Sequence, residues 1–330
     1  MLQAAWVVSV AVGAIVWTIV TVGPLAAADS AFDDWLEDLR TEAESAGISQ
    51  ATIEAALSDL KPIPEVVTLD RRQPEGQLTF QEYKRKVLSK ARVEKGRALL
   101  KKHRSLLHRI AADYNVQPRF IIALWGIETS YGSFLGGHDV VPALATLAYD
   151  GRRAKLFRSE LIAALRILDR GDVMLEDMRG SWAGAMGQSQ FMPSSFLRFA
   201  VDYDGDGKRD IWNSLPDVFA SIANYLSKAG WDNRYTWGRQ VKLASAKKDP
   251  AEVKGLKIVK TLPEWQSMGI RRKNGRSLPS AAVEASLLHT DDGDGPAYLV
   301  YGNFRVLMIW NRSTYFALTV SELSDLIISG

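Results

Sequence analysis

Apolar residues recur at helical spacing through most of the chain, separated by short polar, proline-rich or glycine-rich breaks. This spacing predicts helices over residues 32–60, 79–114 (as one helix or two), 120–131, 150–169, 216–230 and 319–328. Breaks are expected at residues 61–64, which contain two prolines, and in a loop around residues 70–75. Pro118 and Gly132 are typical of the two ends of the helix over residues 120–131.

Between about residues 240 and 310 the pattern changes to short alternating runs separated by Gly, Pro and Asp. Such runs predict strands near residues 241–243 and 256–259 and over residues 297–306. Residues 291–295 (DDGDG) are expected to form a hairpin turn before the last strand. The chain is therefore expected to be mainly α with a small β part (α+β).

The first residues differ from the rest, because no charge occurs between residues 4 and 22. The small-residue pattern that ends at Ala28 predicts a secretory signal peptide over residues 1–28. No Lys or Arg precedes the apolar run, and the run is long enough to remain as an uncleaved membrane anchor. Both interpretations predict export to the periplasm or cell envelope.

Composition excludes several kinds of chemistry. The 330 residues include no cysteine, which excludes disulfides, thiol nucleophiles and thiolate metal sites. The four histidines form no HExxH motif, so a zinc hydrolase is poorly supported. No phosphate-binding glycine loop is present, and we expect no cofactor for the chemistry.

The helical stretch over residues 79–114 is strongly basic, with ten Lys and Arg and only Glu94 between residues 84 and 104. A solvated helix face explains this pattern, and so does a surface that meets an anionic polymer. Nucleic acid is not expected as a partner of an exported chain with a formal charge of only +3.

Glu128 follows eight uncharged residues in residues 120–128 (FIIALWGIE). Apolar surroundings and a position in the last helical turn both favour the protonated form of a carboxyl group. A glutamate that keeps its proton near neutral pH is suited to general acid catalysis. The alternative is a helix-terminal glutamate paired with an arginine.

Residues 181–195 (SWAGAMGQSQFMPSS) combine small residues with amides, hydroxyls and aromatic rings. Small residues allow a backbone to approach a ligand closely, and amides and hydroxyls suit sugar groups. A tight loop before a helix would have the same composition, so this segment alone does not decide between the two.

Three segments together resemble the membrane-bound lytic murein transglycosylase B family: residues 126–132 (GIETSYG), 143–153 (ALATLAYDGRR) and 184–194 (GAMGQSQFMPS). The resemblance extends from about residue 32 to 329. It implies a catalytic domain over residues 29–330, with a helical subdomain at about 30–115 and a lysozyme-like core at about 116–238 and 300–330. A small β insertion would occupy about residues 239–300.

The resemblance implies that Glu128 cleaves the β-1,4 bond between N-acetylmuramic acid and N-acetylglucosamine without water. Glu128 would protonate the glycosidic oxygen and then take the proton of the C6 hydroxyl, which closes a 1,6-anhydro ring. The muramoyl acetamido group would stabilise the cation at C1. One carboxylate is then sufficient, whereas most glycosidases use two.

The same matching implies a set of saccharide-binding residues: Tyr83, Arg152, Arg153, Ser181, Gln190, Phe191, Tyr225 and Asn311. Ser181 and Gln190 are expected near the acetamido group, and the two arginines near glycan carboxylates, unless they are plain surface residues. Trp310 stands where the family pattern has a tyrosine, so ring stacking is expected without the hydroxyl contact.

Residues 202–210 (DYDGDGKRD) have the spacing of an EF-hand-like calcium loop, with a glycine at position 6. The expected ligands are Asp202, Asp204, Asp206, the carbonyl of Lys208, and Asp210. Asn213 replaces the usual glutamate at position 12, so Asp210 is expected to complete the set. The transglycosylase B family carries such a loop, which supports a structural Ca²⁺. The alternative is an acidic turn without an ion.

Two other functions remain open from the sequence. A hydrolytic lysozyme would use Asp139 or Asp150 beside Glu128, and a peptidoglycan-binding protein would cleave nothing. The expected partners are peptidoglycan glycan strands, with other cell-wall enzymes as further candidates, and the chain is expected to be a monomer.

Overall fold

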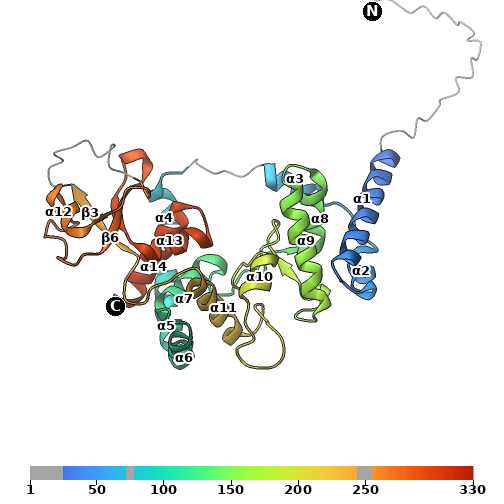
Figure 1. Ribbon diagram of the computed structural model, residues 1–330, viewed down its shortest axis with the longest axis horizontal. Helices are drawn as coiled ribbons and strands as arrows, with labels where there is room; N and C mark the ends of the chain where they lie inside the picture. Colours follow the sequence, from blue (N-terminus) through green and yellow to red (C-terminus); the bar gives the residue numbers. More distant parts are fainter. Residues whose placement is uncertain (1–24, 72–77, 244–254, 330) are drawn as a thin grey trace, which may run out of the picture.

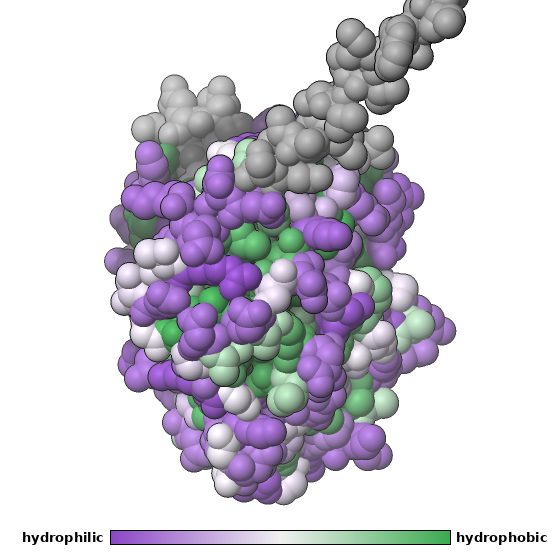
Figure 2. All heavy atoms as spheres, turned by 90° about the vertical axis from the view of Figure 1, so that its right-hand side faces the viewer, coloured by the Kyte–Doolittle hydropathy of each residue, from purple (hydrophilic) through white to green (hydrophobic). Residues whose placement is uncertain are grey.

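The computed structural model describes residues 25–71, 78–243 and 255–329. The molecule is elongated, with α1 and α2 at one end, a small sheet with α12 at the other and the other helices between them (Figure 1). Viewed from the end that carries α1 and α2, the surface is mostly hydrophilic with a hydrophobic patch in its middle (Figure 2).

The N-terminal region consists of α1 (Leu25–Ser45), α2 (Gln50–Leu57) and α3 (Pro64–Arg71). The helical periodicity over residues 32–60 is confirmed as two helices, because Gly47 adopts a φ of +80° and separates α1 from α2. The loop expected from residue 70 is wrong for Asp70 and Arg71, which close α3. Residues 72–77 of that loop lie outside the described residues.

Most of the predicted leader lies outside the described residues, because they begin at Leu25. Helix α1 runs through Ala28, the predicted cleavage position. In the part of the chain that the structure describes, no helix is long and apolar enough to cross a membrane.

The basic stretch forms three helices: α4 (Phe80–Val87), α5 (Lys90–Lys102) and α6 (Arg104–Tyr114). The sequence predicted one or two helices here, so the prediction missed at least one of the two breaks. Leu88 leaves the helical conformation at φ −96° and ψ 68°, and the Ser89 hydroxyl caps α5 by accepting from the Arg92 amide. His103 forms the second break.

The centre of the molecule is a helical core around α7 (Pro118–Thr129), which packs against α5 and α14 (Thr314–Ile328). All residues from Phe120 to Gly126 are buried, as their uncharged sequence predicts. The surrounding helices are α8 (Val140–Asp150), α9 (Ala154–Asp169), α10 (Pro193–Phe199), α11 (Leu215–Lys228) and α13 (Gly302–Trp310). The helical spacing did not predict α8 or α13.

The sheet is antiparallel with strand order β4-β6-β7-β3-β5. Its strands are β3 (Gly238–Leu243), β4 (Lys260–Thr261), β5 (Ile270–Arg272), β6 (Glu284–His289) and β7 (Ala297–Val300), and α12 (Leu262–Ser267) packs beside them. A separate hydrophobic cluster around Trp265 lies beneath it. The expected fold class, mainly α with a small β part, is confirmed.

The hairpin predicted at residues 291–295 is confirmed, since β6 and β7 pair across it. The strand expected to continue to residue 306 is wrong, because β7 ends at Val300 and α13 begins at Gly302. The strand expected at residues 256–259 is also wrong; the nearest strand is β4.

The hairpin turn is tied to the helical core through Asp291. Its Oδ1 accepts hydrogen bonds from the Phe80 amide at 2.7 Å and from the Tyr315 hydroxyl at 2.6 Å. Tyr315 lies in α14 and its ring is 5.9 Å from that of Tyr83 in α4. The sheet is thereby connected to the helix that carries a predicted groove residue.

Replacing Gly126 by alanine should destabilise the fold although alanine favours helices. The new Cβ would lie 2.5 Å from a ring carbon of buried Tyr131, and overpacking of this kind costs about 1–3 kcal/mol. Urea unfolding followed by tryptophan fluorescence measures the loss. The Gly302→Ala control places its Cβ in open space within a helix and should cost nothing. Equal stability of the two variants would contradict this prediction.

Candidate functional site

Glu128 is the second-last residue of α7, and the chain turns sharply after it. Ser130, Tyr131 and Gly132 all adopt positive φ, at 51°, 62° and 72°. The Tyr131 amide returns to the Trp125 carbonyl at 3.2 Å, and its hydroxyl donates to the Arg92 carbonyl at 2.8 Å. The carboxyl group is thus presented by a helix end whose backbone is fixed on both sides.

Among the described residues, the Glu128 side chain meets one hydrogen-bond donor, the indole of Trp310. Trp310 Nε1 donates to Glu128 Oε1 at 2.6 Å. Burial raises the pKa of Glu128 to about 7, and the Trp310 hydrogen bond opposes that rise. The carboxyl group is therefore about half protonated at neutral pH, as the apolar sequence before it predicted.

Aromatic rings surround this contact. The Trp310 ring centroid lies 4.6 Å from that of Tyr225 and 5.3 Å from that of Phe191. Burial raises the pKa of the Tyr83 hydroxyl, and the charge of Glu128 adds to the rise, which places Tyr83 within electrostatic reach of the carboxylate. Three predicted groove residues, Tyr83, Phe191 and Tyr225, thus lie around Glu128.

The segment over residues 181–191 folds back on itself beside α7. Isolated β-bridges pair Met186 with Gly180 and with Phe191. The Ser181 hydroxyl accepts from the amides of Ala183 and Ala185, at 3.3 and 3.0 Å. The segment is a tight loop, as one interpretation of the sequence held, and that loop supplies Phe191 to the aromatic wall.

Gln188 joins this loop to α7. Its Oε1 accepts from Trp125 Nε1 at 2.7 Å and its Nε2 donates to the Trp212 carbonyl at 2.7 Å. The Thr129 hydroxyl, next to Glu128 in sequence, donates to the Gln188 carbonyl at 3.0 Å. Because Gln188 and Thr129 are buried, these bonds hold the loop and the helix end in one arrangement.

Gln190 connects the same loop to the segment after Glu128. It adopts a positive φ of 50°, and its Nε2 donates to the carbonyls of Leu135 and Gly187, both at 3.0 Å. In the described part of the chain nothing donates to its Oε1. The amide nitrogen therefore has a structural role, and the oxygen is available to a ligand.

Asn311 follows Trp310 directly and caps the next turn. Its Oδ1 accepts from the Ser313 amide at 2.9 Å, and the backbone of Asn311 ends α13. The predicted groove residue therefore fixes the link between α13 and α14, next to the tryptophan that contacts Glu128.

Arg152 and Arg153, the two arginines predicted to bind saccharide, follow the end of α8 and contact α3. Arg152 Nη1 donates to the Asp70 carbonyl at 2.9 Å, and Arg153 Nη2 forms an ion pair with the Asp70 carboxylate. The Asp70 side chain is 2% exposed, while those of Arg152 and Arg153 are 49% and 36% exposed. Both guanidinium groups thus have a structural partner and an accessible surface.

The acidic loop over residues 202–210 has internal hydrogen bonds. Asp202 accepts from the amides of Gly205 and Gly207, and Asp206 accepts from the Lys208 amide. Asp210 instead accepts from the amides of Trp212 and Asn213, which caps the following turn.

A carboxylate that the spacing did not predict completes the cluster. Oxygens of Asp202, Asp204 and Asp217 lie within 4.8 Å of one another. Asp217 lies in the first turn of α11, fully buried, and accepts from the amides of Tyr203 and Asp210 at 2.7 and 2.8 Å. Burial raises its pKa to about 6.

Sequence reasoning missed three of these roles. The tryptophan at position 310 was noted for stacking, but its hydrogen bond to Glu128 depends on a contact 182 residues away in sequence. Gln188 belonged to the right segment, yet its partners Trp125 and Trp212 lie in other segments. Asp217 stands three residues after Ser214, the N-cap residue of α11. This spacing indicates the start of a helix and does not indicate a metal ligand.

A mainly helical fold that presents a desolvated carboxyl group beside aromatic rings is typical of lysozyme-like enzymes that cleave glycosidic bonds. Residues 31–325 match the transglycosylase SLT domain family, and the chain belongs to that family. It is a lytic murein transglycosylase that acts on peptidoglycan.

Comparison with individual proteins supports the same family. The chain is 31% identical over 292 residues to membrane-bound lytic murein transglycosylase B of Escherichia coli K12, covering 84% of this chain and 78% of the relative. SltB3 from Pseudomonas aeruginosa in complex with NAG-anhNAM-pentapeptide matches with a TM-score of 0.85 and 43% identity, over 91% of this chain and 80% of that one. Escherichia coli Slt35 in complex with calcium matches with a TM-score of 0.75 and 29% identity, over 88% and 92%.

Replacing Trp310 by phenylalanine should raise the pKa of Glu128 above its value of about 7. The indole hydrogen bond lowers this pKa, so its loss leaves burial unopposed. Carbon-13 NMR titration of the glutamate carboxyl groups measures the change. Tyr225→Phe is the control, because that hydroxyl donates to the Ile309 carbonyl and not to Glu128. A lower pKa in Trp310→Phe would contradict the assignment.

The raised pKa of Glu128 also makes the stability of the fold depend on pH. The pKa of Glu128 is about 7 in the folded protein and 4.5 in the unfolded chain. The contribution of Glu128 to the free energy of unfolding is therefore fully present below pH 4.5 and is lost as pH rises through 7. Stability of the wild type should therefore fall over this window relative to Glu128→Gln, which cannot ionise. Unfolding in urea at pH 5 and pH 8 gives the comparison.

Proposed function

We propose that Glu128 is the only acid and base in the reaction of this transglycosylase. The observation that carries the proposal is the pairing of a desolvated carboxyl group with one donor from the described residues, Trp310 Nε1, at 2.6 Å. An indole N–H can donate but cannot accept, so Oε1 must act as the acceptor. The proton of the neutral acid therefore resides on Oε2.

The protonated Glu128 gives its Oε2 proton to the glycosidic oxygen as the bond to C1 of the muramoyl sugar breaks. The muramoyl acetamido group stabilises the positive charge at C1. Glu128 is then a carboxylate, and the Trp310 hydrogen bond becomes charge-assisted and stronger. The carboxylate takes the C6 hydroxyl proton while that oxygen bonds to C1, which closes the 1,6-anhydro ring and regenerates the acid.

A hydrolytic lysozyme would use either Asp139 or Asp150 beside Glu128, and both of these carboxylates have other partners. Asp139 forms an ion pair with Arg179, and Asp150 forms one with Arg71 at 2.7 Å. No neighbouring carboxylate contributes to the pKa shift of Glu128 among the described residues. This arrangement favours one carboxylate over the pair that hydrolysis requires.

We assign the other saccharide-binding roles from where the side chains lie relative to Glu128. Tyr83 and Tyr225 provide ring faces for sugars beside Glu128, and Phe191, which is only 3% exposed, supports the rings of Tyr225 and Trp310 from behind. The Gln190 Oε1, which accepts no hydrogen bond from the described residues, suits an acetamido N–H. We assign Ser181 and Asn311 to the groove on their attachment to the same loop and to Trp310. Arg152 and Arg153 keep exposed guanidinium surface for glycan carboxylates while Asp70 orients them.

The Glu128→Gln variant tests the proposal. Its amide keeps the Trp310 hydrogen bond but cannot give a proton, so turnover of purified sacculi should fall by at least about 1,000-fold while glycan binding persists. Mass spectrometry of wild-type products should show 1,6-anhydromuramic acid ends, and kcat/KM should fall above pH 7 as the acid ionises. Products with only reducing ends would identify a hydrolase, and intact glycan with both proteins would identify a binding protein.

We also propose that the loop over residues 202–210 holds a structural Ca²⁺ together with Asp217. Hard cations take carboxylate and carbonyl oxygens, and Asp202, Asp204 and Asp217 supply such oxygens within 4.8 Å. Asp206, the Lys208 carbonyl and Asp210 remain candidate ligands from the spacing, although Asp210 caps a turn. The calcium complex of the relative Slt35 supports this choice of ion.

Calcium removal should lower the thermal stability of the wild type. An ion at 100 times its dissociation constant stabilises a protein by about 2.7 kcal/mol, and chelation by EGTA removes that contribution. Differential scanning fluorimetry should show recovery on adding Ca²⁺. Asp202→Ala should abolish the response, whereas Asp177→Ala, an acid outside the cluster, should keep it. An unchanged melting temperature in EGTA would argue for an acidic turn without an ion.

We place the enzyme in the cell envelope, since its substrate lies there and its Escherichia coli relative is membrane-bound. Export through the predicted leader over residues 1–28 and the single catalytic domain over residues 29–330 remain part of this proposal. A monomer that acts on glycan strands also remains part of this proposal.

A further inference from the structure

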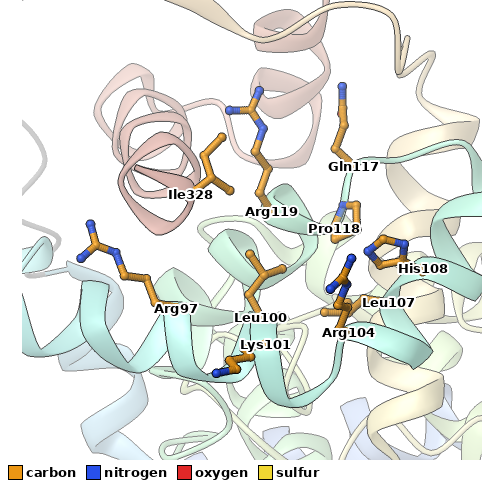
Figure 3. Close-up of a pocket in the computed structure, with 10 residues that line it drawn as sticks. All are labelled: Arg97, Leu100, Lys101, Arg104, Leu107, His108, Gln117, Pro118, Arg119 and Ile328. Carbon is orange, nitrogen blue, oxygen red and sulfur yellow. The ribbon is translucent and has the colours of Figure 1, made fainter. Parts of the chain in front are cut away.

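A hollow of about 480 Å³ lies at the other end of α7 from Glu128. It is lined by α5, α6, the start of α7 and the end of α14 (Figure 3). Leu100 and Ile328 point toward each other across it, and Pro118 and Leu107 add apolar surface. Its volume is within the range of small-ligand sites.

Of the described residues that line this hollow, five are basic and none is acidic. Arg97 donates to the Leu326 carbonyl, and Arg119 pairs with Asp325 at 2.5 Å. Lys101 and Arg104 are exposed and have no hydrogen-bond or ion-pair partner in the described part of the chain. These two cations are therefore available to an anionic ligand.

The hollow is distinct from the groove. Pro118 and Glu128 are ten positions apart in α7, which at 1.5 Å per residue corresponds to roughly 15 Å along the helix. The neutral polar groups of the hollow belong to Gln117, whose amide is engaged by Trp231 and by two backbone carbonyls.

We propose that this hollow binds an acidic peptide, namely a stem peptide on a second peptidoglycan strand. This inference rests on the proposed function, because it supposes peptidoglycan as the surrounding polymer. Carboxylates of the peptide would pair with Lys101 and Arg104 while its apolar side chains contact Leu100 and Ile328. The binding energy holds the enzyme against the wall while the groove works on another strand.

The shape of the site favours a peptide over a lipid surface. Attraction to an anionic membrane increases with the number of cations that face it together. Here the two unpartnered cations border a concave site with an apolar floor, which suits one compact ligand.

Peptide binding is tested on the full chain carrying Glu128→Gln, with the free stem pentapeptide as the probe in calorimetry. Adding Lys101→Ala and Arg104→Ala should weaken binding about tenfold. The matched control, Lys102→Ala with Arg109→Ala, removes two exposed cations from the same helices outside the hollow and should leave affinity unchanged. Equal affinity of all three proteins overturns the proposal.

Turnover separates this site from the groove. With an otherwise wild-type chain, Lys101→Ala/Arg104→Ala should slow the cleavage of sacculi several-fold but leave the cleavage of peptide-free glycan unchanged. An equal loss on both substrates overturns the proposal, as does lost binding to phosphatidylglycerol vesicles with peptide binding intact. Failure of the proposed function would appear separately, as missing anhydro ends in the wild type, while peptide binding to the Glu128→Gln chain would be unaffected.

Discussion

The burial of Glu128 is the constraint on which the rest of the site depends. A carboxyl group at the end of an apolar helix loses its hydration, and this loss moves its pKa to about 7. Complete isolation would leave an acid too weak to release its proton. The Trp310 indole supplies one hydrogen bond at 2.6 Å and thereby keeps the carboxylate accessible as an intermediate state.

The surroundings of Glu128 are rigid because the hydrogen bonds around it are internal. Gln188 joins Trp125 in α7 to the Trp212 carbonyl, and Thr129 bonds the carbonyl of the same glutamine. Arg92 and Lys95 of the basic helix α5 donate to Ser130 and Ser133 in the segment after Glu128. Part of the basic stretch is thus structural support for the catalytic helix end. Such preorganisation lowers the reorganisation needed during proton transfer.

The sequence predicted the elements whose signals are local. The buried helix α7, its end after Glu128 and the hairpin at residues 291–295 all follow from residue spacing and turn residues. The sequence-based prediction failed where contacts between distant parts of the chain determine the local structure. The break at His103 carries no Gly or Pro, and α13 begins within an apolar run that also suits a strand.

The same limit applies to the site. Glu128 was recognisable from its uncharged neighbours, but the donor on its Oε1 comes from α13 and no spacing rule links the two. Asp210 fitted the metal-loop spacing, whereas the fold directs Asp217 toward Asp202 and Asp204 and uses Asp210 to cap a turn.

The attachment of Asp291 to the helices has a consequence for how this protein can change over evolution. The residue holds the first turn of α4 and the hydroxyl of Tyr315, whose ring contacts Tyr83. Substitutions in this turn would shift the tyrosine at the groove even if the hairpin itself still formed. Selection on saccharide affinity should therefore restrict the turn more tightly than folding of the sheet alone requires.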